Sequence, residues 1–242
     1  MKKVIVLPAY NASRTLEATV ASLPAGAFDE IMLVDDCSSD GTYELALKLG
    51  LKAARHTRNR GYGGNQKTCY SMALDGGADI VVMLHPDYQY DPRVIPFMTG
   101  LIEAGVCDVL LGNRIRTRAE ALSGGMPVYK YAANRLLTIA ENLAAGQNLG
   151  EWHSGLRAYS KAALLKVNWE ENSDGFVFDS QFLFEAAFKG LRIGDVPVPA
   201  RYFPEASSIG PGGCLGYGAG TLLAMTEFLL NKTGLVSTRR YR

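Results

Sequence analysis

His85, Asp87 and Gln89 stand at every second position in the stretch MLHPDYQYDP, residues 83 to 92, at the end of an apolar run. In an extended chain alternate side chains project to the same side, so these three would face one site together. Carboxylate and amide oxygens are ligands of hard divalent cations, whereas an imidazole nitrogen suits Mn²⁺ and softer metals better. A short polar loop after a strand produces the same alternation, so this stretch alone leaves both interpretations open.

A second group of candidate residues is the carboxylate pair Asp35 and Asp36 in LVDDCSSDGT, residues 33 to 42. The pair ends an apolar run, and Ser39 or Asp40 then offers a capping side chain to a following helix. Paired carboxylates at a strand end accept hydrogen bonds from a base or from ribose hydroxyls. Asp40 and Gly41 alone would indicate only a turn, whereas the turn together with the carboxylate pair is more specific.

The stretch GYGGNQKT, residues 61 to 68, resembles a phosphate-binding P-loop only in part. A P-loop has glycine immediately before its lysine, whereas Gln66 precedes Lys67 here, and the preceding AARHTRN is a poor buried strand. These departures argue against a nucleotide triphosphatase. The glycines instead predict a close approach of the backbone to a phosphate or ribose, where a helix starts near Asn65.

These candidate residues follow a regular alternation of elements in the first half of the chain. Apolar runs without polar alternation predict strands that are covered on both faces. The predicted strands are 4–7, 30–35, 79–84 and 108–112, and helical patterns lie near 14–22, 42–49, 65–75 and 92–104. This order predicts the α/β fold class, with a doubly wound, mostly parallel sheet flanked by helices. Ligands bind such sheets at the carboxyl ends of the strands, where the candidate residues stand.

The second half of the chain continues the same domain. Helical patterns near 128–145 and 178–189 are followed by the strand-like RIGDVPVPARYF. Near residues 113 to 128 the chain is basic and then glycine-bearing, which fits a mobile lid or a plain surface loop. We expect one domain over residues 1–212, followed by an amphipathic helix and basic tail over residues 213–242.

The C-terminal tail combines an apolar helical pattern with Lys232, Arg239, Arg240 and Arg242. A helix with an apolar face and a basic end can lie on an anionic membrane surface. The pattern equally suits a helix that packs on its own core or in a homo-oligomer. Its apolar stretch TLLAMTEFLL contains Glu227 and falls short of the roughly 20 residues that span a bilayer.

The bulk composition is that of an ordinary globular protein. Hydrophobic residues make up 48% of the 242 residues, and the net charge of +1 argues against a general nucleic-acid-binding protein. The four cysteines show no paired spacing of the zinc or redox kind, which predicts reduced thiols. Pro8 and Asn11 interrupt the N-terminal apolar run before a signal-peptide core can form. We therefore expect a cytoplasmic protein, which the C-terminal helix could also place at the inner face of the membrane.

Five stretches together resemble the family 2 glycosyltransferases with the GT-A fold. They are PAYN at 8–11, VDDCSSDGT at 34–42, NRGYGGNQ at 59–66, DYQ at 87–89 and GNR at 112–114. Within that family, SGLRAYS at 154–160 and RIGDVPV at 192–198 are similar to elements of the polyprenyl-phosphate (dolichyl-phosphate) sugar transferases. The resemblance covers about residues 3 to 205 in consistent order.

The resemblance implies roles for individual positions. Asp87 matches the last aspartate of the family's DxD metal motif, Gln89 matches the glutamine two residues on, and Arg114 matches the arginine that approaches the donor phosphates. Asp87 and Arg114 are therefore catalytic candidates. The positions expected to bind the nucleotide sugar are Pro8, Tyr10, Asn11, Asp35, Asp36, Asn59, Gly61 and Pro86.

His85 is the main departure from the family pattern, because it stands where relatives have the first aspartate. Three interpretations stay open: a manganese-preferring site, a site held chiefly by Asp87, Gln89 and the donor diphosphate, or direct contact of His85 with a phosphate. The expected cofactor is a divalent metal, Mn²⁺ or Mg²⁺.

The resemblance further implies transfer of a hexose, mannose or glucose, from a GDP- or UDP-sugar with inversion. A phosphate acceptor is already anionic, whereas a hydroxyl acceptor needs a general base. In FVFDSQ, residues 176 to 181, Asp179 is retained but Gln181 replaces a glutamate of many relatives, which favours a polyprenyl phosphate acceptor. The basic residues expected to hold the lipid phosphate are Arg157 and Arg201, with Arg114, Arg116 and Arg118.

Two alternatives stay open from the sequence. The chain could transfer the sugar to a saccharide or another hydroxyl, with Asp179 as the general base. It could also bind a nucleotide sugar without turnover, because the first aspartate of the metal motif is missing.

Overall fold

The structure is a computed structural model that describes residues 1–201 and 211–242, with the backbone alone over 211–215. In these ranges seven strands form one sheet in the order β3-β2-β1-β4-β6-β5-β7. The strands are β1 (Lys3–Ala9), β2 (Glu30–Asp35), β3 (Lys52–Arg55), β4 (Ile80–Leu84), β5 (Val109–Asn113), β6 (Leu156–Ser160) and β7 (Ile193–Pro197).

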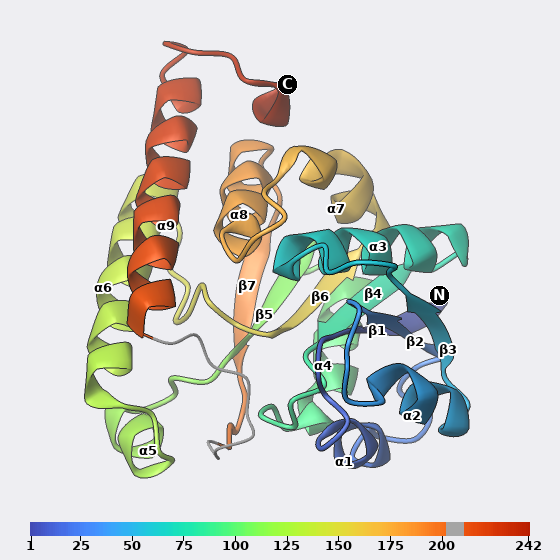
Figure 1. Ribbon diagram of the computed structural model, residues 1–242. Helices are drawn as coiled ribbons and strands as arrows, with labels where there is room; N and C mark the ends of the chain where they lie inside the picture. Colours follow the sequence, from blue (N-terminus) through green and yellow to red (C-terminus); the bar gives the residue numbers. More distant parts are fainter. Residues whose placement is uncertain (202–210) are drawn as a thin grey trace.

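Helices flank this sheet (Figure 1). The α-helices are α1 (Leu16–Ala21), α2 (Thr42–Lys48), α3 (Tyr62–Asp75), α4 (Ile95–Glu103), α5 (Arg118–Ser123), α6 (Val128–Ala145), α7 (Lys161–Lys166), α8 (Phe178–Phe188) and α9 (Pro211–Lys232). Short 3₁₀ turns are η1 (Pro92–Val94), η2 (Trp169–Glu171) and η3 (Arg239–Tyr241). The segment predicted as a lid or loop contains α5.

The pairing of the strands confirms the predicted α/β class. β1 pairs in parallel with β2 and β4, β2 pairs in parallel with β3, and β5 pairs in parallel with β7. β6 runs antiparallel between β4 and β5. The chain builds β2 and β3 on one side of β1 and then places β4 on the other side. The gap between the carboxyl ends of β1 and β4 is therefore the topological switch point at which such sheets bind ligands.

Two apolar clusters cover the two faces of the sheet. Val4 and Val6 of β1 belong to the cluster that packs under α3 and α8, whereas Ile5 and Leu7 belong to the cluster under α1, α2 and α4. The alternation follows from the strand geometry, because successive side chains point to opposite faces. Both faces are apolar, which explains why these strands read as continuous hydrophobic runs.

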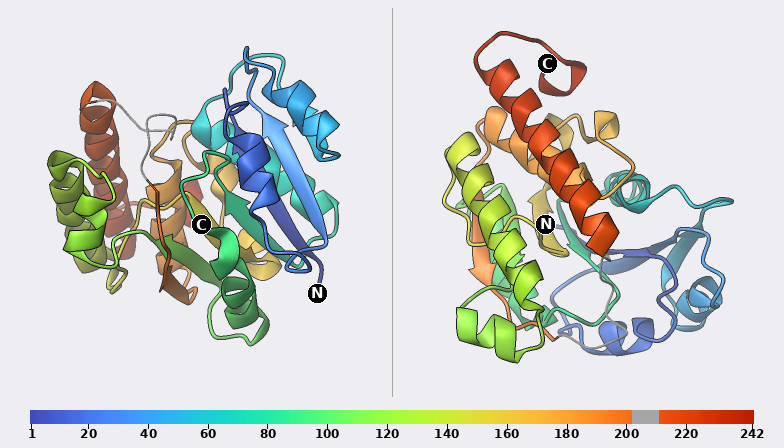
Figure 2. Two further views of the ribbon diagram at one scale, coloured as in Figure 1. Left: turned by 90° about the horizontal axis from the view of Figure 1, so that it is seen from below. Right: turned by 60° about the vertical axis from the view of Figure 1, so that its left-hand side comes forward.

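Helices α6 and α9 lie side by side at the β7 edge of the sheet, away from β1–β3 (Figures 1 and 2). The inner face of α9 packs on the core, where the ring of Phe228 lies 5.1 Å from that of Phe184 and 6.2 Å from that of Tyr241. The predicted C-terminal helix therefore packs on its own domain. Within the described ranges no helix combines the length and the apolarity needed to cross a bilayer.

Three of the four cysteines, Cys37, Cys69 and Cys107, are free thiols. The side chain of Cys214 and the predicted extension of the last strand at residues 202 and 203 lie outside the described residues.

Candidate active site

The loops that follow β1, β2 and β4 meet at the switch point. The register that pairs Ala9 with Asp35 brings the end of β1 beside the end of β2. The hydroxyl of Thr15 donates a 2.6 Å hydrogen bond to the carbonyl oxygen of Pro86, which ties the β1 loop to the β4 loop. The predicted nucleotide residues Pro8, Tyr10, Asn11, Asp35 and Pro86 are thereby collected along one edge.

Asp35 is fully buried at the end of β2 and uses only one of its carboxylate oxygens. Its Oδ2 accepts a hydrogen bond from Ser38 N at 3.2 Å and lies 3.2 Å from Arg55 Nε. Its Oδ1 is buried and has no hydrogen-bond partner among the described residues. Because an unsatisfied buried acceptor is unfavourable, this oxygen is suited to receive an N–H or O–H group of a ligand.

The neighbouring Asp36 has a different environment, because its carboxylate is saturated by its own chain. Its Oδ1 accepts Arg60 N at 2.8 Å and lies 2.7 Å from His56 Nδ1, and its Oδ2 accepts Gly61 N at 2.9 Å. Asn59 Nδ2 donates to the carbonyl oxygen of Asp36 at 3.3 Å. Asp36 therefore shapes the loop that carries Asn59 and Gly61.

The β1 loop offers one aromatic ring to the edge of the sheet. Tyr10 is 57% exposed, which leaves its ring available for stacking. Asn11 has a positive φ of 51° and is held on both sides, because its N–H donates to Ser38 Oγ at 2.8 Å and its Oδ1 accepts Ser39 N at 3.0 Å. The loop is thereby fixed to the segment after β2.

The glycines at the start of α3 meet another part of the chain. Gly63 N and Gly64 N donate to the carbonyl oxygen of Asp174 at 2.7 and 3.2 Å. A Cβ atom at Gly63 would collide with the carbonyl oxygen of Ser173 and would lie 2.8 Å from Phe178 Cβ. The predicted close approach to a phosphate or ribose is therefore not what the structure has. The backbone before α8 occupies that position.

His85 lies at the end of a hydrogen-bonded chain that leads to Asp179. Tyr62 Oη donates to Asp179 Oδ2 at 2.7 Å and lies 3.1 Å from His85 Nε2. Because the tyrosine proton points to the carboxylate, His85 Nε2 carries the ring proton and Nδ1 keeps the lone pair. Burial lowers the pKa of His85, so the ring is neutral.

Asp87, Gln89 and Arg114 come together beside His85. Asp87 Oδ1 accepts Gln89 N at 3.1 Å, and Gln89 Oε1 accepts Arg114 Nη1 at 2.9 Å. Burial raises the pKa of Asp87.

This donor set limits how a metal can bind. In the ranges that the structure describes, no three His, Cys, Asp or Glu side chains converge as metal ligands. The amide oxygen of Gln89 is used by Arg114, so Asp87 is the anionic ligand that the protein offers here. The residues fit a divalent cation that takes its remaining oxygens from a bound diphosphate.

Arg114 is held by a buried carboxylate that the sequence analysis missed. Glu151 is fully buried and accepts Arg114 Nε at 2.9 Å and Arg114 N at 2.8 Å. Arg114 Nη2 also donates to the carbonyl oxygen of His153 at 2.7 Å. The one signal available was an acidic residue three positions before SGLRAYS.

The imidazole of His153 contacts polar side chains of α6 and α9. His153 Nδ1 lies 2.6 Å from Tyr217 Oη on α9, and its Nε2 lies 3.1 Å from Glu141 Oε2 on α6. Ser180 Oγ on α8 donates to Glu141 Oε1 at 2.9 Å. A buried polar cluster thus joins three helices to the backbone that supports Arg114.

Arg157 and Asp179 pair with each other in the core. Arg157 Nη2 lies 3.0 Å from Asp179 Oδ2, Arg157 Nε donates to the carbonyl oxygen of Ser154 at 2.8 Å, and Gln66 Nε2 donates to Asp179 Oδ1 at 3.1 Å. Arg157 is fully buried, whereas Arg201 is exposed, with its guanidinium carbon 4.5 Å from the centre of the Tyr88 ring. Of the two arginines predicted to hold the acceptor phosphate, Arg157 therefore lies in the core and Arg201 at the surface.

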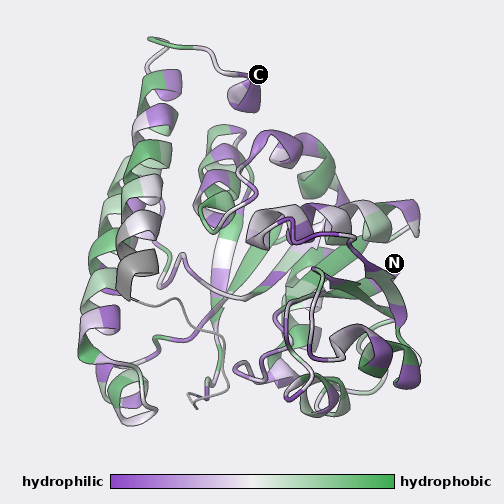
Figure 3. Cartoon of the chain, in the orientation of Figure 1, coloured by the Kyte–Doolittle hydropathy of each residue, from purple (hydrophilic) through white to green (hydrophobic). Residues whose placement is uncertain are grey.

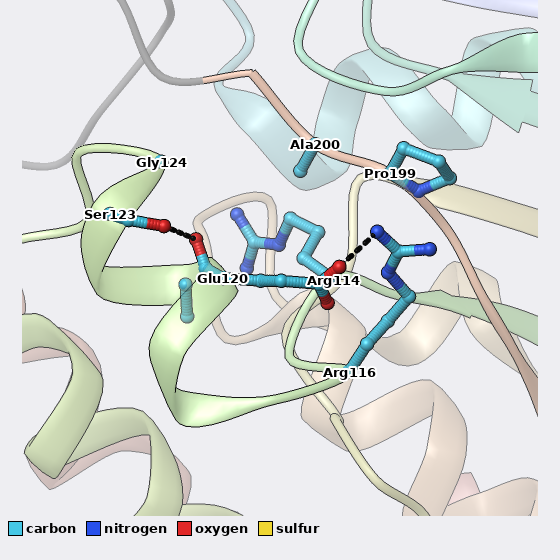
Figure 4. A pocket seen from close by; sticks show the side chains of 8 residues that line it. Arg114, Arg116, Glu120, Ser123, Gly124, Pro199 and Ala200 are labelled. Carbon is cyan, nitrogen blue, oxygen red and sulfur yellow. Dashed lines mark hydrogen bonds and ion pairs between the residues drawn. The ribbon is translucent and has the colours of Figure 1, made fainter.

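A pocket of about 250 Å³ opens beside Arg114 (Figure 4). Among the residues that line the pocket, Arg116 Nη2 donates to Glu120 Oε1 of α5 at 2.6 Å, and Pro199 and Ala200 line it as well. Both arginines lie at this opening, which suits an anionic group.

The sequence matches a known family over most of this region. Residues 4–167 match glycosyl transferase family 2. The chain belongs to that family. For this glycosyltransferase the family match includes β1 to β6, and so it includes Asp35, Asp87, Arg114 and Glu151.

Several known proteins align with most of the length of this glycosyltransferase. A UDP-N-acetylglucosamine–dolichyl-phosphate N-acetylglucosaminyltransferase of Methanococcus voltae is 28% identical, with 88% of this chain and 91% of that protein covered. An undecaprenyl-phosphate mannosyltransferase of Micrococcus luteus is 25% identical, with 82% and 83% covered. The crystal structure of glucosyl-3-phosphoglycerate synthase from Mycobacterium tuberculosis superimposes with a TM-score of 0.72 over 98% of this chain and 81% of that chain, at 20% identity. The glycosyltransferase therefore has the GT-A fold.

Proposed function

We propose that this glycosyltransferase moves a hexose, mannose or glucose, from a UDP- or GDP-sugar to a polyprenyl phosphate with inversion. The observation that carries the proposal is that relatives similar over most of their length are named as dolichyl-phosphate and undecaprenyl-phosphate sugar transferases. The pocket lined by Arg114 and Arg116 supports it, because an anionic acceptor needs cations at its binding site.

The donor would occupy the edge from β1 to β4. Asp35 Oδ1, which is buried without a partner among the described residues, would accept a hydrogen bond from the base or ribose. The exposed ring of Tyr10 would stack on the base. Asp87 and a divalent metal, Mn²⁺ or Mg²⁺, would hold the diphosphate next to Arg114.

The departure of the nucleotide diphosphate is the step that this site would assist. Negative charge grows on the leaving phosphate during transfer, and the metal and Arg114 would stabilise it. Glu151 and the carbonyl oxygen of His153 fix the guanidinium beforehand, so little reorganisation is needed when the charge develops.

The state of Asp179 favours a phosphate acceptor over a hydroxyl acceptor. Its carboxylate is shared among Arg157, Tyr62 and Gln66. A carboxylate with three partners is a poor general base for a hydroxyl, whereas a phosphate needs no base.

Label transfer from UDP- and GDP-sugars to a short polyprenyl phosphate tests the proposal, with Mn²⁺, Mg²⁺ or chelator present. We expect label in the organic phase with one donor and its loss with chelator. Label on an added saccharide instead would favour a hydroxyl acceptor. Tight nucleotide-sugar binding without release of nucleotide would favour a binding protein.

A further inference from the structure

The exposed side of α6 carries no charged side chain. Leu136 is 70% exposed and Leu143 is 80% exposed, although leucine is a residue that proteins usually bury. The three charged residues of α6 all lie on its inner or half-buried side. The large exposed apolar residues of this helix are Val128, Tyr129, Leu136, Ile139 and Leu143.

Helix α9 repeats the same arrangement. Leu223 is 71% exposed, and the one charged residue between Gly216 and Leu230, Glu227, is half-buried and paired with Arg240. The large exposed apolar residues of this helix are Leu222, Leu223, Leu229 and Leu230. Leu229 and Leu230 stand seven positions after Leu222 and Leu223, which is about two helical turns, so the four residues lie along one stripe of the helix.

The two stripes belong to neighbouring helices at one edge of the molecule. Figures 1 and 2 show α6 and α9 side by side, and Figure 3 shows that both are predominantly hydrophobic. We call the exposed apolar residues of these two helices the α6–α9 face. A surface with this much neighbouring apolar exposure marks an interaction site.

We propose that the α6–α9 face docks on an anionic lipid bilayer. Lys232 is the last residue of α9, and Arg239 and Arg242 lie in the segment that follows it. All three are exposed, and at this end of α9 they would meet anionic head groups.

The α6–α9 face lies near the pocket that we propose for the acceptor phosphate. The link between docking and the acceptor rests on the proposed function. α6 starts five residues after α5, and α5 lines the pocket with Arg114 and Arg116. A polyprenyl phosphate has an anionic head and an apolar tail. Docking through the α6–α9 face would bring the pocket to the lipid surface while the tail stays in the bilayer.

Vesicle flotation of the full-length protein tests the inference, with Leu136→Glu on α6 and Leu223→Glu on α9 as variants. Leu165→Glu is the matched control, because Leu165 is 66% exposed on α7, outside this face. On vesicles of equimolar phosphatidylcholine and phosphatidylglycerol, we expect each variant to bind at least about tenfold more weakly than wild type and the control to bind like wild type. Binding to pure phosphatidylcholine should be weaker for every protein.

Wild type that stays unbound to these vesicles would overturn the inference, and so would equal loss in the control. A wild-type dimer in light scattering that Leu136→Glu converts to monomer, without vesicle binding, would assign the face to a second copy. Vesicle binding without transfer to any polyprenyl phosphate would reject the proposed function alone. Transfer to a short soluble polyprenyl phosphate without vesicle binding would reject the docking alone.

Discussion

The guanidinium of Arg157 lies 3.0 Å from the carboxylate of Asp179, and both side chains are buried between β6 and α8. Removing one member of such a pair leaves an uncompensated charge in the core. We expect Arg157→Met to lower the free energy of unfolding by about 3–5 kcal/mol, measured by urea denaturation. The double variant Arg157→Met/Asp179→Leu should regain part of this loss. Full stability of Arg157→Met with a raised KM for the acceptor would instead support phosphate binding by Arg157.

Asp87 is the carboxylate that we expect to hold the metal and diphosphate. Asp87→Asn should lower kcat/KM by at least about a hundredfold, because charge stabilisation at the leaving group is lost. Its melting temperature should stay near that of wild type. Asp75→Asn is the control, since Asp75 is exposed at the end of α3. Metal-stimulated activity near the wild-type value in Asp87→Asn would remove Asp87 from the metal site.

Glu151 should act by positioning Arg114. We expect Glu151→Gln to lower kcat by about tenfold or more with little change in the KM for the donor, because the interaction of Arg114 with the leaving group grows in the transition state. Glu151→Asp, which keeps the charge, should recover part of the activity. Steady-state kinetics with both variants measures this split. An unchanged kcat with a raised KM would mean that Glu151 supports ground-state binding only.

Substitution of Gly63 and of Gly100 by alanine gives a matched pair of tests of helix packing. Gly63→Ala should destabilise the fold by about 1–3 kcal/mol, because its Cβ would collide with the backbone of Ser173. Gly100→Ala in α4 has open space around the new methyl group and should stabilise by about 0.5–1 kcal/mol. Thermal and urea unfolding of both variants measures the difference. Equal effects at the two sites would contradict the observed packing of α3 on the segment before α8.

Asp35 should report on donor binding. Asp35→Asn replaces one buried oxygen acceptor with an N–H donor, so a hydrogen bond from base or ribose would become a repulsive contact at that atom. We expect the preferred nucleotide diphosphate to bind about tenfold or more weakly. Calorimetric titration with UDP and GDP measures this effect. An unchanged affinity for UDP and GDP would show that the buried oxygen of Asp35 does not contact the nucleotide.

The first half of the fold could be predicted because β1, β2, β4 and β5 are covered on both faces and so read as unbroken apolar runs. β3 was missed because KAAR is a half-exposed edge strand with little apolar character. No prediction of a strand was made for β6, whose sequence LRAYS mixes polar and apolar residues.

Parts of the candidate site depend on contacts that no local pattern encodes. The sequence brought Gln89 and Arg114 into one site, and they share a hydrogen bond. Arg157 and Tyr62 both pair with Asp179, which is 22 and 117 residues away in the chain. No local sequence pattern indicates partners at such distances. The ion pair of Arg157 with Asp179 in the core could therefore not be predicted from the sequence.

The contacts from Tyr217 to His153 join α9 to the backbone that holds Arg114. If docking through α9 changes the position of Tyr217, the same change reaches the arginine at the leaving group. Thermodynamic coupling is reciprocal, so if docking strengthens the interaction of Arg114 with the donor diphosphate, a bound donor would raise the affinity of the α6–α9 face for the surface by the same factor. A loaded enzyme would then stay longer at the surface than an empty one, and transfer would be concentrated where acceptor and donor are both present.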